Sequence, residues 1–363
     1  MSAITVENDL VHYEVLGRGK PVILVHGWLG SWRYWVPTMQ QLSIKYRIYA
    51  LDLWGFGDSG KNMSRVGLRD QVKLLYDFMT RMGIERAALV GHSFGAAVCI
   101  AFARQYPEKA PRLMTISAPL FDMGGIDGEP LSNSPSVTVI GPSAGSHAPT
   151  GPIYGASAET IPRNPFKGLG ETPEEILANL KARTASEDLN RGRTSPVLPT
   201  AIARPVGSGG SSSTTPPSSN NPLVDLLTKD DAVALMTRSV GRDAPDFDKL
   251  KSEISKMGTD VLASSAQSFN NYNLAADLQK ITAPTLLLHG EDDPILARPS
   301  DELLRQINRG KAPGAFLPFV EPNLRHFPML EITAKFNRLL IDFLEAQDLI
   351  NVQFKDQWKR TMR

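Results

Sequence analysis

The sequence predicts an α/β fold: a mostly parallel sheet of eight strands, with helices on both faces and a helical cap inserted after the sixth strand. Short apolar runs, which suit strands buried on both faces, alternate along the chain with segments at helical spacing. This alternation stops after residue 122 and resumes near residue 276. The sheet is therefore expected to form from two separate stretches of chain, joined by parallel crossovers.

The first stretch, residues 1–122, is expected to supply the first six strands and to form the first part of the core. Residues 3–15 alternate weakly around an Asn8-Asp9 turn, which predicts an antiparallel hairpin. The run PVILV at 21–25 then predicts a strand buried on both faces. The remaining predicted elements are helices at 32–44, 67–82 and 94–106 and strands at 46–52, 87–90 and 113–117.

The middle of the chain has a different composition. Residues 123–222 are rich in Ser, Pro, Gly and Thr, and 207–222 contain almost no apolar side chains, so this insertion is expected to be flexible. Within it, the sequence TPEE at 172–175 predicts the start of a short helix over 173–183. Residues 223–275 are expected to form the helical cap, with helices at 230–240 and 247–257.

Residues 276–350 are predicted to complete the core, and 351–363 to form a mildly basic C-terminal tail with a solvated or docked end. The predicted elements of this second stretch are strands at 284–289 and 315–320 and helices at 300–308 and 328–347.

Composition excludes several classes of protein. The 39 basic and 38 acidic side chains give a formal charge of +1, so no strong field would attract nucleic acid or an anionic membrane. Cys99 is the only cysteine, which rules out an intrachain disulfide and suits the cytoplasm. We expect no signal peptide in the first twenty residues and no membrane span, because the most apolar run, 87–103, is short and interrupted.

A candidate nucleophile lies at residues 91–95, which read GHSFG and fit the pattern G-x-S-x-G. The motif directly follows a predicted strand and opens a helix of small residues. A serine at such a sharp turn takes a strained backbone, and the flanking glycines let strand and helix approach each other. We therefore predict that Ser93 is a nucleophile whose hydroxyl projects above the sheet, at the positive end of a helix.

A serine nucleophile needs a base and an acid that orients the base. Asp292 and Asp293 come just after the seventh predicted strand, and His326 just after the eighth. Loops at the carboxyl ends of parallel strands are where such sheets place catalytic groups, so Ser93, an aspartate and His326 are expected to converge.

The other histidines are weaker candidates for the base. His26 and His92 lie within motifs and are expected to hydrogen-bond locally. His289 ends a buried strand, and His12 and His147 are interpreted as surface or loop residues.

Four segments, taken in their order, resemble the α/β-hydrolase superfamily, in particular its capped esterase, haloperoxidase and C–C-hydrolase-like members. They are HGW at 26–28, DLWGFGDS at 52–59, the motif around Ser93, and the loops of Asp293 and His326. The resemblance covers residues 5–122 and 223–347, but not 123–222. The segment 52–59 is interpreted as a structural turn beside the site.

The resemblance implies further roles. The backbone N–H groups of Trp28 and Phe94 would form an oxyanion hole. The acid in the family's motif follows the glycine by three residues, which selects Asp293 over Asp292, while some members draw their acid from the position of Asp122. No metal or organic cofactor is implied.

One residue departs from the pattern of the family. Arg325 stands where the family often has glycine, which puts the shape of the loop before His326 in doubt.

These residues lead to the expectation of a serine hydrolase that cleaves an ester-like bond of a small, partly apolar molecule through an acyl-enzyme. A carboxylic ester is favoured, but thioester, lactone, peptide and C–C bond hydrolysis share the same machinery. An aspartate nucleophile would instead indicate haloalkane or epoxide chemistry.

The alternatives of another class are a non-catalytic protein that binds a small ligand and a scaffold whose insertion recruits partners. The oligomeric state stays open.

Overall fold

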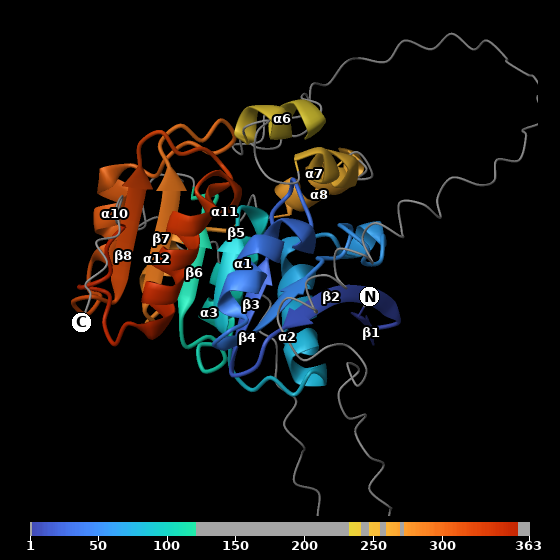
Figure 1. Cartoon of the computed structure of the whole chain (residues 1–363), viewed down its shortest axis with the longest axis horizontal. Helices are drawn as coiled ribbons and strands as arrows, with labels where there is room; N and C mark the ends of the chain where they lie inside the picture. Colours follow the sequence, from blue (N-terminus) through green and yellow to red (C-terminus); the bar gives the residue numbers. More distant parts are fainter. Residues whose placement is uncertain (1, 121–231, 241–246, 255–258, 269–271, 355–363) are drawn as a thin grey trace, which may run out of the picture. The chain divides into compact units, whose positions relative to one another are not determined.

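A computed structural model describes residues 2–120, 232–240, 247–254, 259–268 and 272–354, all within one structural unit. Its sheet has eight strands in the order β1-β2-β4-β3-β5-β6-β7-β8 (Figure 1). The pairs β1–β2 and β2–β4 are antiparallel, and the other neighbours are parallel. The predicted fold class is therefore confirmed.

The strands lie close to their predicted positions. They are β1 (Ser2–Val6), β2 (Asp9–Leu16), β3 (Lys20–Val25), β4 (Tyr46–Leu51), β5 (Ala88–His92), β6 (Leu113–Ile116), β7 (Thr285–Gly290) and β8 (Phe316–Glu321). The residues of β5, β6 and β7 are buried throughout, as expected for central strands of a parallel sheet.

The first hairpin turns one residue earlier than predicted. Val6 pairs with Asp9, so the turn consists of Glu7 and Asn8, and Asp9 already belongs to β2. Both turn residues have positive φ, 47° and 68°. This is the conformation of the two-residue turns whose twist matches paired antiparallel strands.

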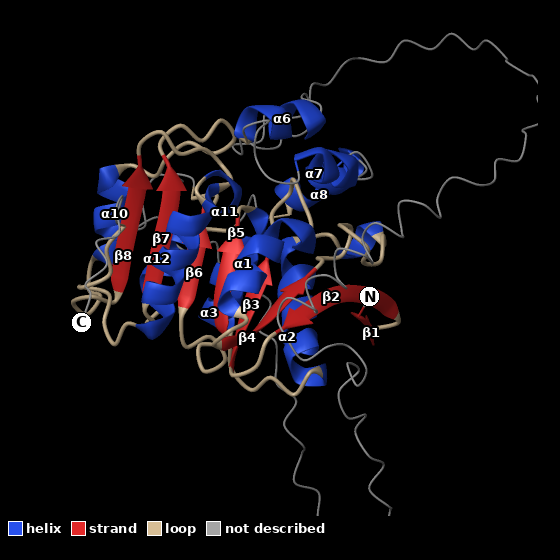
Figure 2. Cartoon of the chain, in the orientation of Figure 1, coloured by secondary structure: helices blue, strands red, loops and turns tan. Residues whose placement is uncertain are grey.

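Helices cover both faces of the sheet (Figure 2). α1 (Val36–Leu42), preceded by the 3-10 turn η1 (Trp32–Trp35), packs beside α12 (Thr333–Glu345) on one face. On the other face, α2 (Leu68–Arg81), α3 (Phe94–Gln105), α9 (Leu274–Lys280) and α10 (Asp301–Asn308) pack in sequence. A short 3-10 turn, η2 (Met63–Arg65), precedes α2.

The two stretches of the core meet between β6 and β7. These strands are parallel neighbours, with Met114 opposite Leu286 and Ile116 opposite Leu288. Ser117 extends this contact by donating its backbone N–H to the carbonyl of Leu288, at 2.9 Å. One continuous sheet is thus built from segments that lie far apart in the sequence.

The region expected to be a cap contains α6 (Ala232–Ser239), α7 (Phe247–Ile254) and α8 (Thr259–Gln267). The expected boundary between residues 275 and 276 falls inside α9, which is capped by the Asn273 side chain and packs on α3. The helix predicted at 173–183 and the insertion at 123–222 lie outside the described residues. None of the helices that the structure describes has the length and apolar character needed to cross a bilayer.

The single helix predicted over 328–347 is in fact two. α11 (Pro328–Glu331) ends at Ile332, whose φ of −133° and ψ of 47° are not helical, and α12 begins at the next residue. The hydroxyl of Thr333 donates back to the carbonyl of Met329, at 2.8 Å, and so bridges the break. α11 directly follows the loop that carries His326.

Candidate active site

Ser93 occupies a sharp turn between β5 and α3. Its backbone has a φ of 54° and a ψ of −118°, a strained conformation for a residue other than glycine. Side chains at Gly91 and Gly95 would overlap the backbone of α3 and of β3 respectively, so only glycine fits at these positions. The backbone N–H of Ser93 donates to Ile116 in β6, at 2.8 Å, which fixes the turn to the sheet.

The structure brings together the three residues predicted for the chemistry. His326 Nε2 lies 3.1 Å from Ser93 Oγ, and His326 Nδ1 lies 2.7 Å from Asp293 Oδ2. Asp293 follows β7, and His326 lies between β8 and α11. All three side chains are at most 1% exposed. In this geometry a serine, an imidazole and a carboxylate can act as nucleophile, base and orienting acid.

Asp293 is held in a fixed orientation as an ionised carboxylate. Its Oδ1 accepts the backbone N–H groups of Ile295 at 2.9 Å and Leu296 at 3.0 Å, which leaves Oδ2 for His326. Burial alone would raise the pKa of Asp293, but the neighbouring His326 outweighs it and holds the pKa well below its usual range. A carboxylate at Nδ1 keeps the imidazole proton there, so Nε2 is free to accept the serine proton.

Asp292, the alternative acid, is exposed and donates its backbone N–H to Leu324. Its carboxylate makes no contact with His326 in the described structure, whereas that of Asp293 does. The other alternative, Asp122, lies outside the described residues.

The residues predicted to supply the oxyanion hole lie beside Ser93. A side chain at Gly27 would come within 2.5 Å of the Ser93 Cβ, so the loop that carries Trp28 passes directly against Ser93. Phe94 is the first residue of α3, and its ring stacks on that of Trp28 with centroids 5.1 Å apart. Both are buried, and the Trp28 indole N–H donates to Ser265 Oγ in α8 at 2.9 Å.

The loop around His326 is held by a carboxylate that the sequence analysis did not single out. Glu331 accepts the backbone N–H of Arg325 through Oε2 at 3.1 Å and that of Phe327 through Oε1 at 2.9 Å. It thereby clamps the chain on both sides of His326. Burial raises the pKa of Glu331.

Arg325, which departs from the expected glycine, does not disturb this loop. Its guanidinium contacts Glu331 and α6: Nε lies 3.5 Å from Glu331 Oε2, and a terminal nitrogen lies 3.3 Å from the carbonyl of Arg238 in α6. The arginine therefore connects the His326 loop to the helices of the expected cap.

Among the other histidines, the prediction that His92 hydrogen-bonds locally was wrong. Its bonds are not local, because Nδ1 lies 2.9 Å from the hydroxyl of Tyr34 and Nε2 lies 2.8 Å from the carbonyl of His326. His26 does bond locally, with Nδ1 2.8 Å from the carbonyl of Gly27. His289 is buried, with Nε2 3.0 Å from the carbonyl of Leu296. His147 lies outside the described residues.

The assignment of His12 to the surface was wrong. His12 lies in β2, is 2% exposed, and contacts Asp52 with Nδ1 3.0 Å from Oδ2. Burial alone would lower the pKa of His12, but the hydrogen bonds with Asp52 and Glu14 outweigh it and raise the pKa to about 9. The pair is therefore a buried ion pair at neutral pH.

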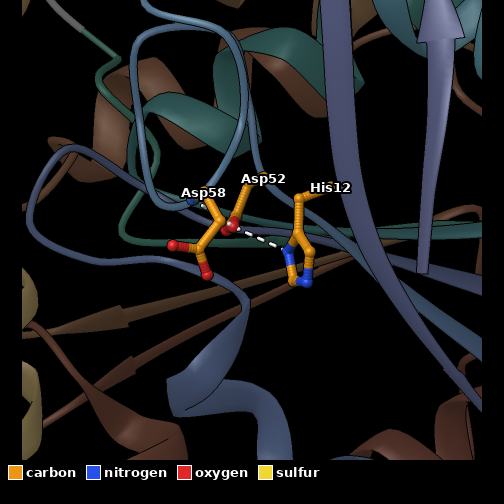
Figure 3. Close-up of side chains that lie close together, drawn as sticks. All are labelled: His12, Asp52 and Asp58. Atoms are coloured by element: carbon orange, nitrogen blue, oxygen red, sulfur yellow. Dashed lines mark hydrogen bonds and ion pairs between the residues drawn. The ribbon is translucent and has the colours of Figure 1, made fainter. Parts of the chain in front are cut away.

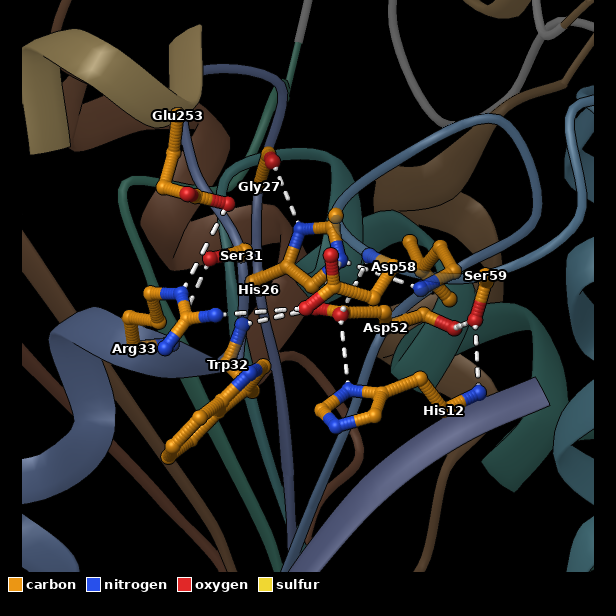
Figure 4. A network of polar contacts seen from close by, with 12 residues as sticks. His12, His26, Gly27, Ser31, Trp32, Arg33, Asp52, Asp58, Ser59 and Glu253 are labelled. Atoms are coloured by element: carbon orange, nitrogen blue, oxygen red, sulfur yellow. Dashed lines mark hydrogen bonds and ion pairs between the residues drawn. The ribbon is translucent and has the colours of Figure 1, made fainter. Parts of the chain in front are cut away.

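Asp52 organises the turn at 52–59, which supports its interpretation as structural (Figure 4). Its Oδ1 accepts the backbone N–H of Trp32 at 2.8 Å, and its Oδ2 accepts that of Asp58 at 2.9 Å. The adjacent Arg33 contacts Asp58 at 3.3 Å and Glu253 of α7 at 3.6 Å. These contacts link η1, the turn and the expected cap.

His12, Asp52 and Asp58 lie close enough together to suggest a metal site (Figure 3). The chemistry of the three donors argues against one. A histidine ligand must offer a lone pair, but His12 Nδ1 donates its proton to Asp52. Asp52 already accepts backbone N–H groups at both oxygens. The cluster is better explained as a structural ion pair.

A family model described as alpha/beta hydrolase fold matches residues 20–192 of the chain. Together with the strand order and the turn at Ser93, this match supports the assignment of the chain to the α/β-hydrolase superfamily.

Known α/β-hydrolases similar to this chain span several chemistries. A soluble epoxide hydrolase of Corynebacterium sp. (strain C12) is 30% identical over 106 residues, which are 29% of this chain and 37% of that protein. A 2-hydroxy-6-oxo-2,4-heptadienoate hydrolase of Pseudomonas putida is 35% identical over 107 residues, which are 28% of this chain and 39% of that protein. The matches thus cover about two fifths of the length of these relatives.

The fold is also that of a solved esterase from Exiguobacterium antarcticum. The two structures superpose with a TM-score of 0.59 over 94% of this chain and 98% of the other, at 14% sequence identity. At this identity the likeness concerns the fold alone.

Proposed function

We propose that the chain is a serine hydrolase that cleaves an ester-like bond, most simply a carboxylic ester, in a small, partly apolar substrate. The observation that carries the proposal is the hydrogen-bonded series from Ser93 Oγ through His326 to Asp293, with links of 3.1 and 2.7 Å. Activation of a serine nucleophile requires an imidazole that is oriented against the hydroxyl, which is the arrangement found here.

The proposed reaction has two steps. In the first, His326 Nε2 takes the Ser93 proton while Oγ attacks the carbonyl carbon, and His326 returns the proton to the departing alcohol. In the second, His326 activates water, which attacks the acyl-enzyme and releases the acid. In both steps the backbone N–H groups of Trp28 and Phe94 would stabilise the oxyanion, each contributing about 3 kcal/mol.

The apolar part of the proposed substrate is suggested by the side chains beside Ser93. The stacked rings of Trp28 and Phe94 provide an apolar wall, and the bond from Trp28 to Ser265 places α8 next to it. We propose that α6, α7 and α8, within residues 223–275, act as the cap that selects substrates.

The nucleophile distinguishes this proposal from the chemistry of the epoxide hydrolase relative. A serine reacts as an alkoxide through its base, which suits attack on an acyl carbon, and the resemblance associates epoxide opening with an aspartate at this position. Ser93 therefore favours acyl transfer.

Hydrolysis of a C–C bond is the second candidate, since the P. putida relative is 35% identical and acts on a ketone-bearing dienoate. The same three residues would serve it. Assay of that dienoate beside a panel of p-nitrophenyl esters of increasing chain length separates the two activities.

The proposal is tested by Ser93→Ala. The variant should fold normally by circular dichroism and lose hydrolysis of a short p-nitrophenyl ester. A fluorophosphonate should label the wild-type protein at Ser93 and leave the variant unlabelled. Undiminished hydrolysis by Ser93→Ala would exclude the mechanism, and a wild-type protein that resists labelling would favour a non-catalytic ligand-binding role.

A further inference from the structure

A line of buried hydrogen bonds connects the loop before Trp28 to the loop of His326. The backbone N–H of Gly27 donates to the Tyr34 hydroxyl at 2.7 Å. That hydroxyl lies 2.9 Å from His92 Nδ1, and His92 Nε2 lies 2.8 Å from the carbonyl of His326. Tyr34 is 4% exposed and His92 is fully buried, so water does not compete for these bonds.

Chemistry fixes the direction of each proton along this line. A carbonyl only accepts, so His92 Nε2 carries a hydrogen. In a neutral ring Nδ1 then accepts, and the Tyr34 hydroxyl is its donor, while the hydroxyl oxygen accepts from Gly27. Every polar atom in the line is satisfied only in this arrangement. If His92 were protonated at both nitrogens, the hydrogen of Tyr34 would have no partner among them.

The surroundings keep His92 neutral. Burial is the main cause that lowers the pKa of His92 well below its usual range, and the adjacent His326 lowers it further. The two imidazole rings have centroids 4.7 Å apart. A neutral His92 is needed at this distance, because His326 gains a positive charge during the proposed reaction and a second cation would oppose it.

We propose that Tyr34 and His92 are positioning residues: they hold the backbone of His326 at a set distance from the loop of Gly27 and Trp28. The inference rests on the proposed function, since it gives these residues a task in the chemistry of Ser93. The base and one of the predicted oxyanion donors, Trp28, come from loops that lie about 300 positions apart in the chain, and this line joins those two loops. Glu331 completes the hold on His326 from the opposite side.

A purely structural pair would affect stability, whereas a positioning pair affects the rate of the chemical step. Displacement of a reacting group by about 1 Å can reduce the rate roughly 100-fold. The expected signature is therefore a lower kcat with little change in KM, and slower reaction of Ser93 with a fluorophosphonate.

The first test removes a single oxygen. Tyr34→Phe should slow fluorophosphonate labelling of Ser93 by about ten- to hundredfold. Tyr49→Phe is the matched control: Tyr49 lies in β4 against Phe78, away from the site, and should label at the wild-type rate. Equal labelling rates for the two variants would overturn the inference.

The second test asks whether the donor at Nε2 is what matters. His92→Gln places an amide N–H near the position of Nε2, and His92→Met has similar length but no donor. Labelling and kcat should be recovered in part by His92→Gln and not by His92→Met. If the two behave alike while both stay folded, the carbonyl of His326 is not held by this bond and the inference fails.

The third test does not depend on activity. With 15N-labelled histidine, the ring nitrogens of His92, assigned through their loss in His92→Gln, should show a neutral ring protonated at Nε2. Tyr34→Phe should shift this pattern. A wild-type His92 that is protonated at Nδ1 or is cationic would overturn the inference, even if Ser93 is labelled normally. Failure of wild-type labelling with the expected His92 pattern would instead reject the proposed function alone.

Discussion

At the scale of single residues, the carboxylate of Asp293 decides which nitrogen of His326 carries the proton. It is anchored by two backbone N–H groups and presents only Oδ2 to the imidazole. The ring is thus held in the orientation that the proposed general base needs, with Nε2 within hydrogen-bond reach of Ser93 Oγ.

Asp293→Asn should keep the fold and lose most of the activity. An amide at this position can donate to Nδ1, which favours the tautomer with its proton at Nε2, and kcat should fall about 10⁴-fold. Ester hydrolysis at pH 7 and circular dichroism measure the two properties. The control is Asp292→Asn, which changes the exposed neighbour and should leave kcat unaltered. A large loss in the control with none in Asp293→Asn would reverse the assignment of the acid.

The residues brought together at the site were predictable where each follows the end of a strand. Ser93, Asp293 and His326 carry this local signal. Tyr34 and Glu331 carry none: the imidazole that Tyr34 contacts lies 58 positions away, and Glu331 acts by accepting backbone N–H groups. His12 was wrongly predicted to be a surface or loop residue, because its partner Asp52 follows 40 positions later and gives no local signal.

At the scale of elements, the approach of β5, β3 and α3 sets the height of Ser93 above the sheet. Gly91 and Gly95 allow backbone to touch backbone there, since an added Cβ would overlap the neighbouring chain. The turn therefore depends on two missing side chains as much as on the serine.

Gly95→Ala should destabilise the protein and displace Ser93. Its Cβ would meet the carbonyl oxygens of Val25 and His26, so β3 and α3 must separate, at a cost of about 3 kcal/mol. Gly310→Ala is the control: Gly310 has a φ of 79° but no atom within 4 Å of its Cβ, and it should lose only about 1 kcal/mol. Denaturant unfolding compares the two, and equal losses would show that an added Cβ at Gly95 does not force β3 and α3 apart.

The positions of the strands could be predicted from apolar runs. The predicted bounds were wrong where backbone geometry sets the end of an element. The runs at 21–25 and 284–289 correspond to β3 and β7. The first turn falls at Glu7 and Asn8 because both residues have positive φ angles, and the turn contains no glycine that would have indicated them in the sequence. The break at Ile332 likewise lacks a glycine or proline, and it coincides with the reach of Glu331 back to the His326 loop.

At the scale of the whole molecule, the buried pair of His12 and Asp52 ties the antiparallel edge of the sheet to the turn at 52–59. Burying two charges has a large desolvation penalty, and removing one partner of the pair destabilises the protein further because the other charge stays buried without compensation. Because the pKa of His12 is about 9 in the folded protein and near 6.5 when unfolded, folding favours the protonated imidazole.

The free energy of unfolding should decrease as the pH rises above 6.5, because the folded protein favours protonated His12. The contribution of His12 to stability is fully present below pH 6.5 and is lost as the pH rises through about 9. The free energy of unfolding should fall by up to about 3 kcal/mol over this interval. Urea unfolding at a series of pH values measures it.

His12→Asn provides the control, since its amide still donates to Asp52 but does not titrate. This variant should be less stable than the wild type at pH 6.5 and should show a flatter profile up to pH 9. The same slope in both proteins would assign the effect to other groups.

The junction of β6 and β7 has a consequence for how the molecule becomes active. Ser93 belongs to the stretch before this junction, and Asp293 and His326 belong to the stretch after it. Neither stretch alone holds a complete set of the proposed reacting groups. The proposed reactivity of the serine therefore arises only once β6 and β7 have paired. Reaction at Ser93 would then report assembly, and the chain offers a natural place to split a reporter into two complementing pieces.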